Sequence, residues 1–476
     1  MVQVILASFI ALSATTLLAA QQSAPPAKSD DLAKAIAEMR NLPEKLTGRE
    51  AEERGPRIQA AWETLIAAKD AGAAALLAEA AKLDAAKQKD DRFRLGAAAV
   101  VWQIGHFDRI ADVVTLWGTS DFAVKYNYAF PVAFEAAHDG DERALPLLVA
   151  LLRDQRGTYY VADHVMDLGW PLTHFFLWGP IGTKGVPALE KVLATAKDAT
   201  AVSSAIELLT WCWHVANLPQ LRAIARDPAH GARATAIRAL GRFGHPDDFE
   251  FLCAGLGDRD PKVVKAHVEA LGAFGDLRAV PRVLPLTTHA DQDLRLDALG
   301  ALCMLATVDG LEALAQQLAG LDDATRSHFA GGPPLFQAID VSWDDYQKLD
   351  RAERGKVVAK ARAKAEEEFL PKEGDRKLTH EEFESICKSW IAASRIRDEE
   401  HEWVESRHVL AVATPADVPL LLDLRGRLFR RLSDECLEEV EILDGILRRV
   451  VRSQYRTEPG LCEQVKPVPE AKGKAK

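Results

Sequence analysis

The chain has 476 residues, of which 48% are hydrophobic but only 7% aromatic, and its formal net charge is -11. A chain of this length can bury one large core or, in a repeat architecture, a long row of small cores. The charge argues against a nucleic-acid partner, because binding a phosphate backbone requires clustered lysine and arginine, and the concentrated basic segment is a short tail at residues 466–476.

The first twenty residues are apolar and end in small residues before Gln21, a composition typical of a secretory signal peptide. No lysine or arginine precedes Val4, so an uncleaved N-terminal membrane anchor and an ordinary buried helix stay open as alternatives. Residues 21–29 are rich in proline, alanine and serine and are expected to form a flexible linker. We therefore predict an exported protein, periplasmic or secreted, without a transmembrane span in its mature chain.

Helical patterns then follow one another, and we assign residues 30–330 to an α-solenoid. The first three segments are rich in alanine and are separated by Gly55-Pro56 and Gly72, which suits an atypical capping unit. A long aromatic insertion at 169–185 interrupts the later segments. The helices that we expect before the clearest repeats span 31–40, 56–69, 73–87, 93–104, 110–117, 121–137, 145–152, 159–168, 186–196, 202–216 and 218–225.

One pattern returns three times at a spacing of 31 residues between Asp227 and Ala319. Each copy has apolar residues at i, i+3 and i+6, the stripe of a helix that buries one face, and a second, shorter stripe follows it. A single helix pair cannot bury its apolar face alone, so such units stack on their neighbours. The equivalent first-helix positions are Ile237, Val268 and Leu299, then Leu240, Leu271 and Leu302, then Phe243, Phe274 and Leu305.

The first helices end in ALGRFG at Ala239 and ALGAFG at Ala270, and the second begins with DPKVV at Asp260. These motifs resemble HEAT-like repeats of the short bacterial kind, which include the bilin-lyase repeats. The resemblance implies an all-α solenoid of stacked helix pairs. It also implies a binding scaffold, since most proteins of this kind bind other proteins.

Beyond the array, residues 331–377 are expected to form a charged helical linker, because the helix at 348–369 is rich in lysine, arginine, glutamate and alanine. A smaller C-terminal helical region follows at 378–460, and a disordered basic tail at 461–476. Capping patterns at Thr379, Thr414 and Ser433 predict three helices in this region. The apolar stripe from Val418 to Leu422 can pack against the stripe from Val440 to Val450.

Aromatic residues gather in four consecutive units of the predicted array. Rigid rings with a polar edge suit the capture of a peptide or a glycan, so we predict that they contact a partner on the concave face, where the second helices align. The alternative is that the rings fill a wider core around the insertion. The residues that we assign to partner binding are Tyr128, Tyr159, Trp170, Trp178, Trp211 and Trp213.

His401, Glu405 and His408 stand at i, i+4 and i+7 and would share one face of a helix. Two imidazoles and a carboxylate can bind zinc or iron. The alternative is a solvated helix face, and no metal or other cofactor is assigned.

Cys212, Cys253 and Cys303 lie within apolar helical segments and are expected to be small buried residues rather than parts of a disulfide framework. No catalytic residue is assigned either. We interpret the chain as a non-catalytic exported scaffold that binds a protein or peptide, with a glycan as another ligand. A metal-dependent enzyme using the histidine face is the alternative function.

Overall fold

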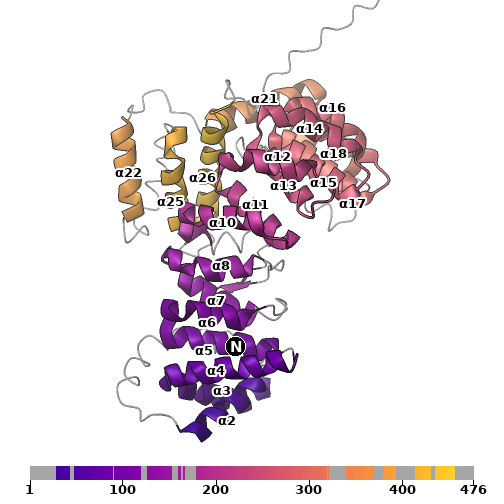
Figure 1. Ribbon diagram of the computed structural model, residues 1–476. Helices are drawn as coiled ribbons and strands as arrows, with labels where there is room; N and C mark the ends of the chain where they lie inside the picture. Colours follow the sequence, from indigo (N-terminus) through magenta and orange to yellow (C-terminus); the bar gives the residue numbers. More distant parts are fainter. Residues whose placement is uncertain are drawn as a thin grey trace, which may run out of the picture. The chain divides into compact units, whose positions relative to one another are not determined.

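The computed structural model describes residues 28–42, 48–88, 90–118, 126–152, 159–161, 164–166, 178–318, 320, 339, 341–367, 379–392, 413–429 and 435–455. It is an all-α solenoid of stacked helix pairs, as the sequence predicts (Figure 1). The chain forms two compact units, Met1–Leu208 with Gly426–Ser433 and Leu209–Arg425 with Asp434–Lys476. Of the helices described, none combines the length and the hydropathy needed to cross a bilayer.

In the first unit, helices that follow one another in the sequence also pack against one another. The helix α5 lies within the stack and is buried on nearly every side from Phe93 to Trp102, which explains why this stretch is apolar apart from Arg94, whose guanidinium donates to the carbonyl oxygen of Ala80. The helices of the first unit are α2 (Ser29–Arg40), α3 (Gly48–Ala67), α4 (Asp70–Ala85), α5 (Asp91–Gly105), α6 (Ile110–Trp117), α7 (Tyr126–Ala137), α8 (Leu145–Leu151) and α10 (Val186–Thr195), and α11 (Ala199–Trp211) begins in this unit and ends in the second.

The helix α3 begins at Gly48 and continues through Pro56, whereas the sequence predicts a helix that starts at Pro56. A proline inside a helix removes one backbone hydrogen bond. Here its ring faces solvent, while Ile58, Trp62 and Leu65 of the same helix are buried. The apolar burial along α3, which packs against α2 and α4, outweighs this local penalty.

The helix predicted at 159–168 is wrong. The structure has an antiparallel hairpin there, with β1 (Tyr159–Val161) paired to β2 (His164–Met166) so that Tyr159 faces Met166 and Val161 faces His164. Aromatic and β-branched residues favour strands, and two residues between the strands are the commonest hairpin connection. The segment is too short for apolar spacing to separate the two structures.

The second unit contains the repeats at the predicted 31-residue spacing. Aspartates at Asp260 and Asp291 accept backbone hydrogen bonds at the helix starts, and Gly244 and Gly275 end the first helices in the left-handed conformation, with φ of 65° and 78°. The helices are α12 (Leu218–Arg226), α13 (Arg233–Phe243), α14 (Phe249–Ala254), α15 (Pro261–Phe274), α16 (Val280–Val283), α17 (Gln292–Leu305) and α18 (Val308–Leu318).

Glycines let the first helices approach one another closely. A Cβ atom at Gly241 of α13 would lie 2.4 Å from the carbonyl oxygen of Ala270 in α15, and one at Gly272 would lie 2.9 Å from Cα of Ala301 in α17. The glycine in each ALGxFG motif is therefore the contact point for the next repeat. The equivalent residue of α17 is Cys303, which packs in a different core.

That core closes the array after α18. It takes in α20 (Trp343–Lys348) and α21 (Arg351–Glu367), whose Val358 and Ala361 are 6% and 0% exposed. The sequence predicts a charged helical linker here, but Val358 and Ala361 of this highly charged helix are buried in the core and Val357 packs against it, so α21 is part of the packed array. The buried residues of this core are Leu299, Cys303, Leu311, Leu314, Trp343, Tyr346, Val358 and Ala361.

The C-terminal region has the three predicted helices, α22 (His380–Ala392), α25 (Val418–Phe429) and α26 (Glu435–Arg452). Reciprocal capping contacts join Thr379 to Glu382 and Thr414 to Asp417, as the sequence predicts. The apolar stripe of α26 is buried throughout, at Val440, Leu443, Ile446, Leu447 and Val450.

Candidate partner-binding residues and the arginine-capped edge

Three of the six residues assigned to partner binding are buried in the structure. Trp178, Trp211 and Trp213 are 4%, 6% and 2% exposed, so their rings pack inside the protein. Tyr128 lies in α7 and Tyr159 in β1, and their side chains lie outside the described residues, as does Trp170 altogether. Partner contact by this set stays a prediction, and the three buried tryptophans offer almost no surface for it.

The two tryptophans at the end of α11 have polar partners. The guanidinium of Arg425 lies 3.7 Å from the ring centroid of Trp211, a cation–π contact. Trp213 meets the ring of Phe243 edge to face at 6.0 Å, and its indole Nε1 donates a hydrogen bond to Oδ1 of Asp444 at 3.2 Å. Both rings therefore connect the repeats to the C-terminal helices of the same unit.

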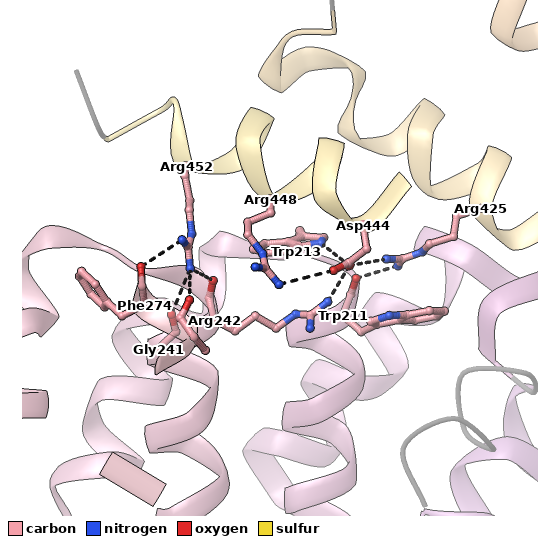
Figure 2. Close-up of polar contacts among 10 residues, drawn as sticks. Trp211, Trp213, Gly241, Arg242, Phe274, Arg425, Asp444, Arg448 and Arg452 are labelled. Carbon is pink, nitrogen blue, oxygen red and sulfur yellow. Dashed lines mark hydrogen bonds and ion pairs between the residues drawn. The ribbon is translucent and has the colours of Figure 1, made fainter. Parts of the chain in front are cut away.

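Asp444 of α26 is the centre of this polar cluster (Figure 2). Its Oδ1 accepts from Nη2 of Arg242 at 2.6 Å and from Nη1 of Arg425 at 3.3 Å, and Nη2 of Arg448 lies 4.0 Å from Oδ2. Burial alone would raise the pKa of Asp444, but the three arginines together hold it below its usual range. Burial lowers the pKa of Arg425 to about 10, which leaves this group charged at neutral pH.

Arg452, at the end of α26, caps two helices at once. Its Nη2 donates to the carbonyl oxygens of Gly241, Arg242 and Ala273 at 3.2, 2.7 and 2.9 Å, and its Nη1 donates to that of Phe274 at 3.1 Å (Figure 2). These carbonyls lie in the last turns of α13 and α15. The C-terminus of a helix leaves its final carbonyls without intrahelical partners and carries partial negative charge, so a buried cation is favourable there.

Two other arginines also donate hydrogen bonds to carbonyl oxygens at helix C-termini. Arg425 Nη2 donates to the carbonyl oxygen of Trp211 at the end of α11, at 2.7 Å. Arg362 of α21 donates to those of Leu305 and Ala306 at the end of α17, both at 2.7 Å. We call this row of helix C-termini, at Trp211, Phe243, Phe274 and Leu305, the arginine-capped edge. Sequence reasoning missed it, because a carbonyl row has no signature and the arginines come from more than 50 residues away in the chain.

The metal hypothesis is not tested by the structure, because His401, Glu405 and His408 lie outside the described residues. Within the described ranges, no group of three or more metal-ligating side chains comes together. The prediction of small buried cysteines is confirmed for Cys253 and Cys303, which are buried free thiols, whereas the free thiol of Cys212 is only partly buried. Cys387 is a further buried free thiol.

Comparison with known proteins supports the repeat interpretation. Residues 186–270 match the family described as HEAT repeats, a span that contains α10 to most of α15. No curated protein matches the chain. HEAT repeats are protein-interaction modules in general, so the matched segment is a helical scaffold of the kind that binds proteins.

Proposed function

We propose that this protein is a non-catalytic scaffold that binds a protein or peptide partner across the exposed face of its stacked first helices. The observation that supports this most directly is the match to HEAT repeats, together with the regular approach of α13, α15 and α17. Stacked repeats place equivalent surface residues at a constant distance from one helix to the next, and such a regular surface suits a partner that binds in an extended conformation.

Three considerations favour the first helices over the second helices that the sequence suggested. The second helices α14 and α16 are short, spanning Phe249–Ala254 and Val280–Val283, and much of each is buried. At the arginine-capped edge, α21 and α26 of the same chain already cover the ends of α13, α15 and α17. The first helices carry the one exposed large hydrophobic side chain among the residues described, Met304, which is 53% exposed.

Met304 lies one turn after Gly300, and the equivalent positions 62 and 31 residues before Gly300 are Arg238 of α13 and Glu269 of α15. The side chains of these two residues are 45% and 38% exposed and form an ion pair between the two helices. A Cβ at Gly300, one turn before Met304, would meet nothing within 4 Å, so the surface beside Met304 is open. This face offers an apolar anchor beside a polar rim, the usual anatomy of a protein interface.

Photo-crosslinking tests the proposal. A photoreactive amino acid is placed at Met304 or at Glu269 on the proposed face, and at Arg259, an exposed loop residue between α14 and α15, as a control. We expect the first two positions to crosslink the same protein in its native cells and Arg259 not to. Equal crosslinking from all three positions would show that the first-helix face is not a specific surface.

Export remains part of the proposal and rests on the apolar first twenty residues. The intact mass of the protein isolated from its own cells decides it. Cleavage near Gln21 gives a chain shorter than the full 52.1 kDa. A full-length mass in the membrane fraction would instead support an uncleaved anchor.

A further inference from the structure

We propose that Arg242 and Arg448, beside Asp444, form a binding site for an oxyanion, either a carboxylate or a phosphate. Both residues belong to the second unit, Arg242 to α13 and Arg448 to α26. The inference does not depend on the proposed scaffold function.

Positive charge is in excess around Asp444. Arg242, Arg425 and Arg448 all lie within 4.0 Å of the carboxylate of Asp444. Among these four side chains, three positive charges face one negative charge, an excess of two positive charges. Such an excess is costly in a partly buried site and favours the entry of a further anion.

Two arginines beside Asp444 have unused donors. Three donors converge on Oδ1 of Asp444, whereas Arg448 stays 4.0 Å from Oδ2, too far for a hydrogen bond. The Nε atoms of Arg242 and Arg448 are buried and have no acceptor. A guanidinium has five N–H groups in a plane and binds carboxylate or phosphate through two of them at once. The two residues therefore hold donors of the kind that an oxyanion needs.

Solvent has access to two of the three arginines. The side chains of Arg242 and Arg448 are 29% and 31% exposed, whereas that of Arg425 is 2% exposed. Solvent reaches the first two, and Arg425 is committed to Trp211 and Asp444. The buried ring of Trp213 lies 5.0 Å from the guanidinium of Arg242 and supports it with an apolar surface from behind, which strengthens a charge contact.

Isothermal titration calorimetry of the full chain tests the site. One arm titrates inorganic phosphate. The other titrates a short capped peptide with glutamate at its centre, with the same peptide carrying glutamine as its reference. Chloride is the only other anion, at constant ionic strength. We expect at least one oxyanion to bind, and Arg448→Gln to weaken that binding tenfold or more, whereas Arg282→Gln, on the exposed surface of α16, leaves it unchanged.

Arg448→Lys serves as a second variant in case Arg448→Gln misfolds, because lysine keeps the positive charge. Lysine lacks the planar guanidinium with its paired N–H donors, so Arg448→Lys should also weaken binding. Binding of phosphate alone identifies a free anion as the ligand, and selective binding of the glutamate peptide identifies a protein-borne carboxylate. Absence of binding in both arms, or binding that Arg448→Gln and Arg448→Lys leave intact, would overturn the proposal.

Discussion

A buried histidine in α15 should make the second unit sensitive to mild acid. His267 is 0% exposed, and its ring packs 5.3 Å from that of Phe251 and directly against Gly255, where a Cβ would lie 2.0 Å from Nε2. Burial lowers the pKa of His267 from 6.5 to about 4, and a contact with the backbone of Leu252 offsets only part of that shift. The folded protein therefore holds this imidazole neutral at pH values where the unfolded chain protonates it.

The sign and size of the effect follow from linkage. Below pH 6.5 the unfolded state binds more protons than the folded state, so the free energy of unfolding falls as the pH falls, until the folded imidazole also protonates near pH 4. A pKa difference of roughly 2.5 corresponds to a loss of about 3.4 kcal/mol below pH 4, and about 2 kcal/mol of it is present at pH 5.

Urea denaturation at pH 7 and pH 5, followed by circular dichroism, measures this loss. His267→Leu removes the titrating imidazole. Between pH 7 and pH 5 the unfolding free energy of the wild type should therefore fall by about 2 kcal/mol more than that of His267→Leu. His289→Asn is the control, because this exposed side chain can still accept the backbone hydrogen bond from Asp291. An equal loss in the wild type and in His267→Leu would refute the assignment.

Three further predictions concern packing, charge and thiol chemistry. Gly241→Ala should destabilise the protein by about 1–3 kcal/mol in thermal or chemical melts, because its Cβ meets the backbone of Ala270, whereas Gly300→Ala, which meets nothing within 4 Å, should be neutral or stabilising. Asp444→Asn should cost about 3–5 kcal/mol by removing the carboxylate shared by three arginines, and Asp293→Asn, whose exposed carboxylate pairs only loosely with Lys265, about 1 kcal/mol or less in the same assay. Cys303 and Cys387 should react with iodoacetamide only after unfolding, because burial raises their thiol pKa values to about 11 and about 12, and rapid labelling in native buffer would contradict this.

The repeats were predictable because their apolar residues recur with both a helical period and a 31-residue period. The helical period predicts the individual helices, and the 31-residue period predicts that they form pairs that stack on one another. The left-handed caps at Gly244 and Gly275 lie where the ALGxFG motifs end. The hairpin at Tyr159 was not predictable in the same way, because three-residue strands contain too few positions to distinguish the two kinds of spacing.

The roles of Trp211 and Trp213 were open in the sequence for a different reason. A tryptophan suits a core and an interface equally well, and its place depends on what lies over it. Here Arg425 and Asp444 cover the pair, and these residues are more than 200 positions away in the chain. The packing of α21 was not predictable because the charge of the whole segment hides Val358 and Ala361, its two residues buried in the core.

The contacts at the arginine-capped edge should constrain the number of repeats. In an open solenoid each unit interacts only with its neighbours, so units can be gained or lost almost independently. Here Arg452 contacts the ends of α13 and α15 while Arg362 contacts the end of α17, so the later segments of the chain are matched to the first helices of three consecutive repeats. An array with one pair fewer would leave one of these cations without its carbonyls, and an array with one pair more would leave a helix end uncapped. The spacing of Arg362 and Arg452 in the later segments is thus matched to the present number of repeats.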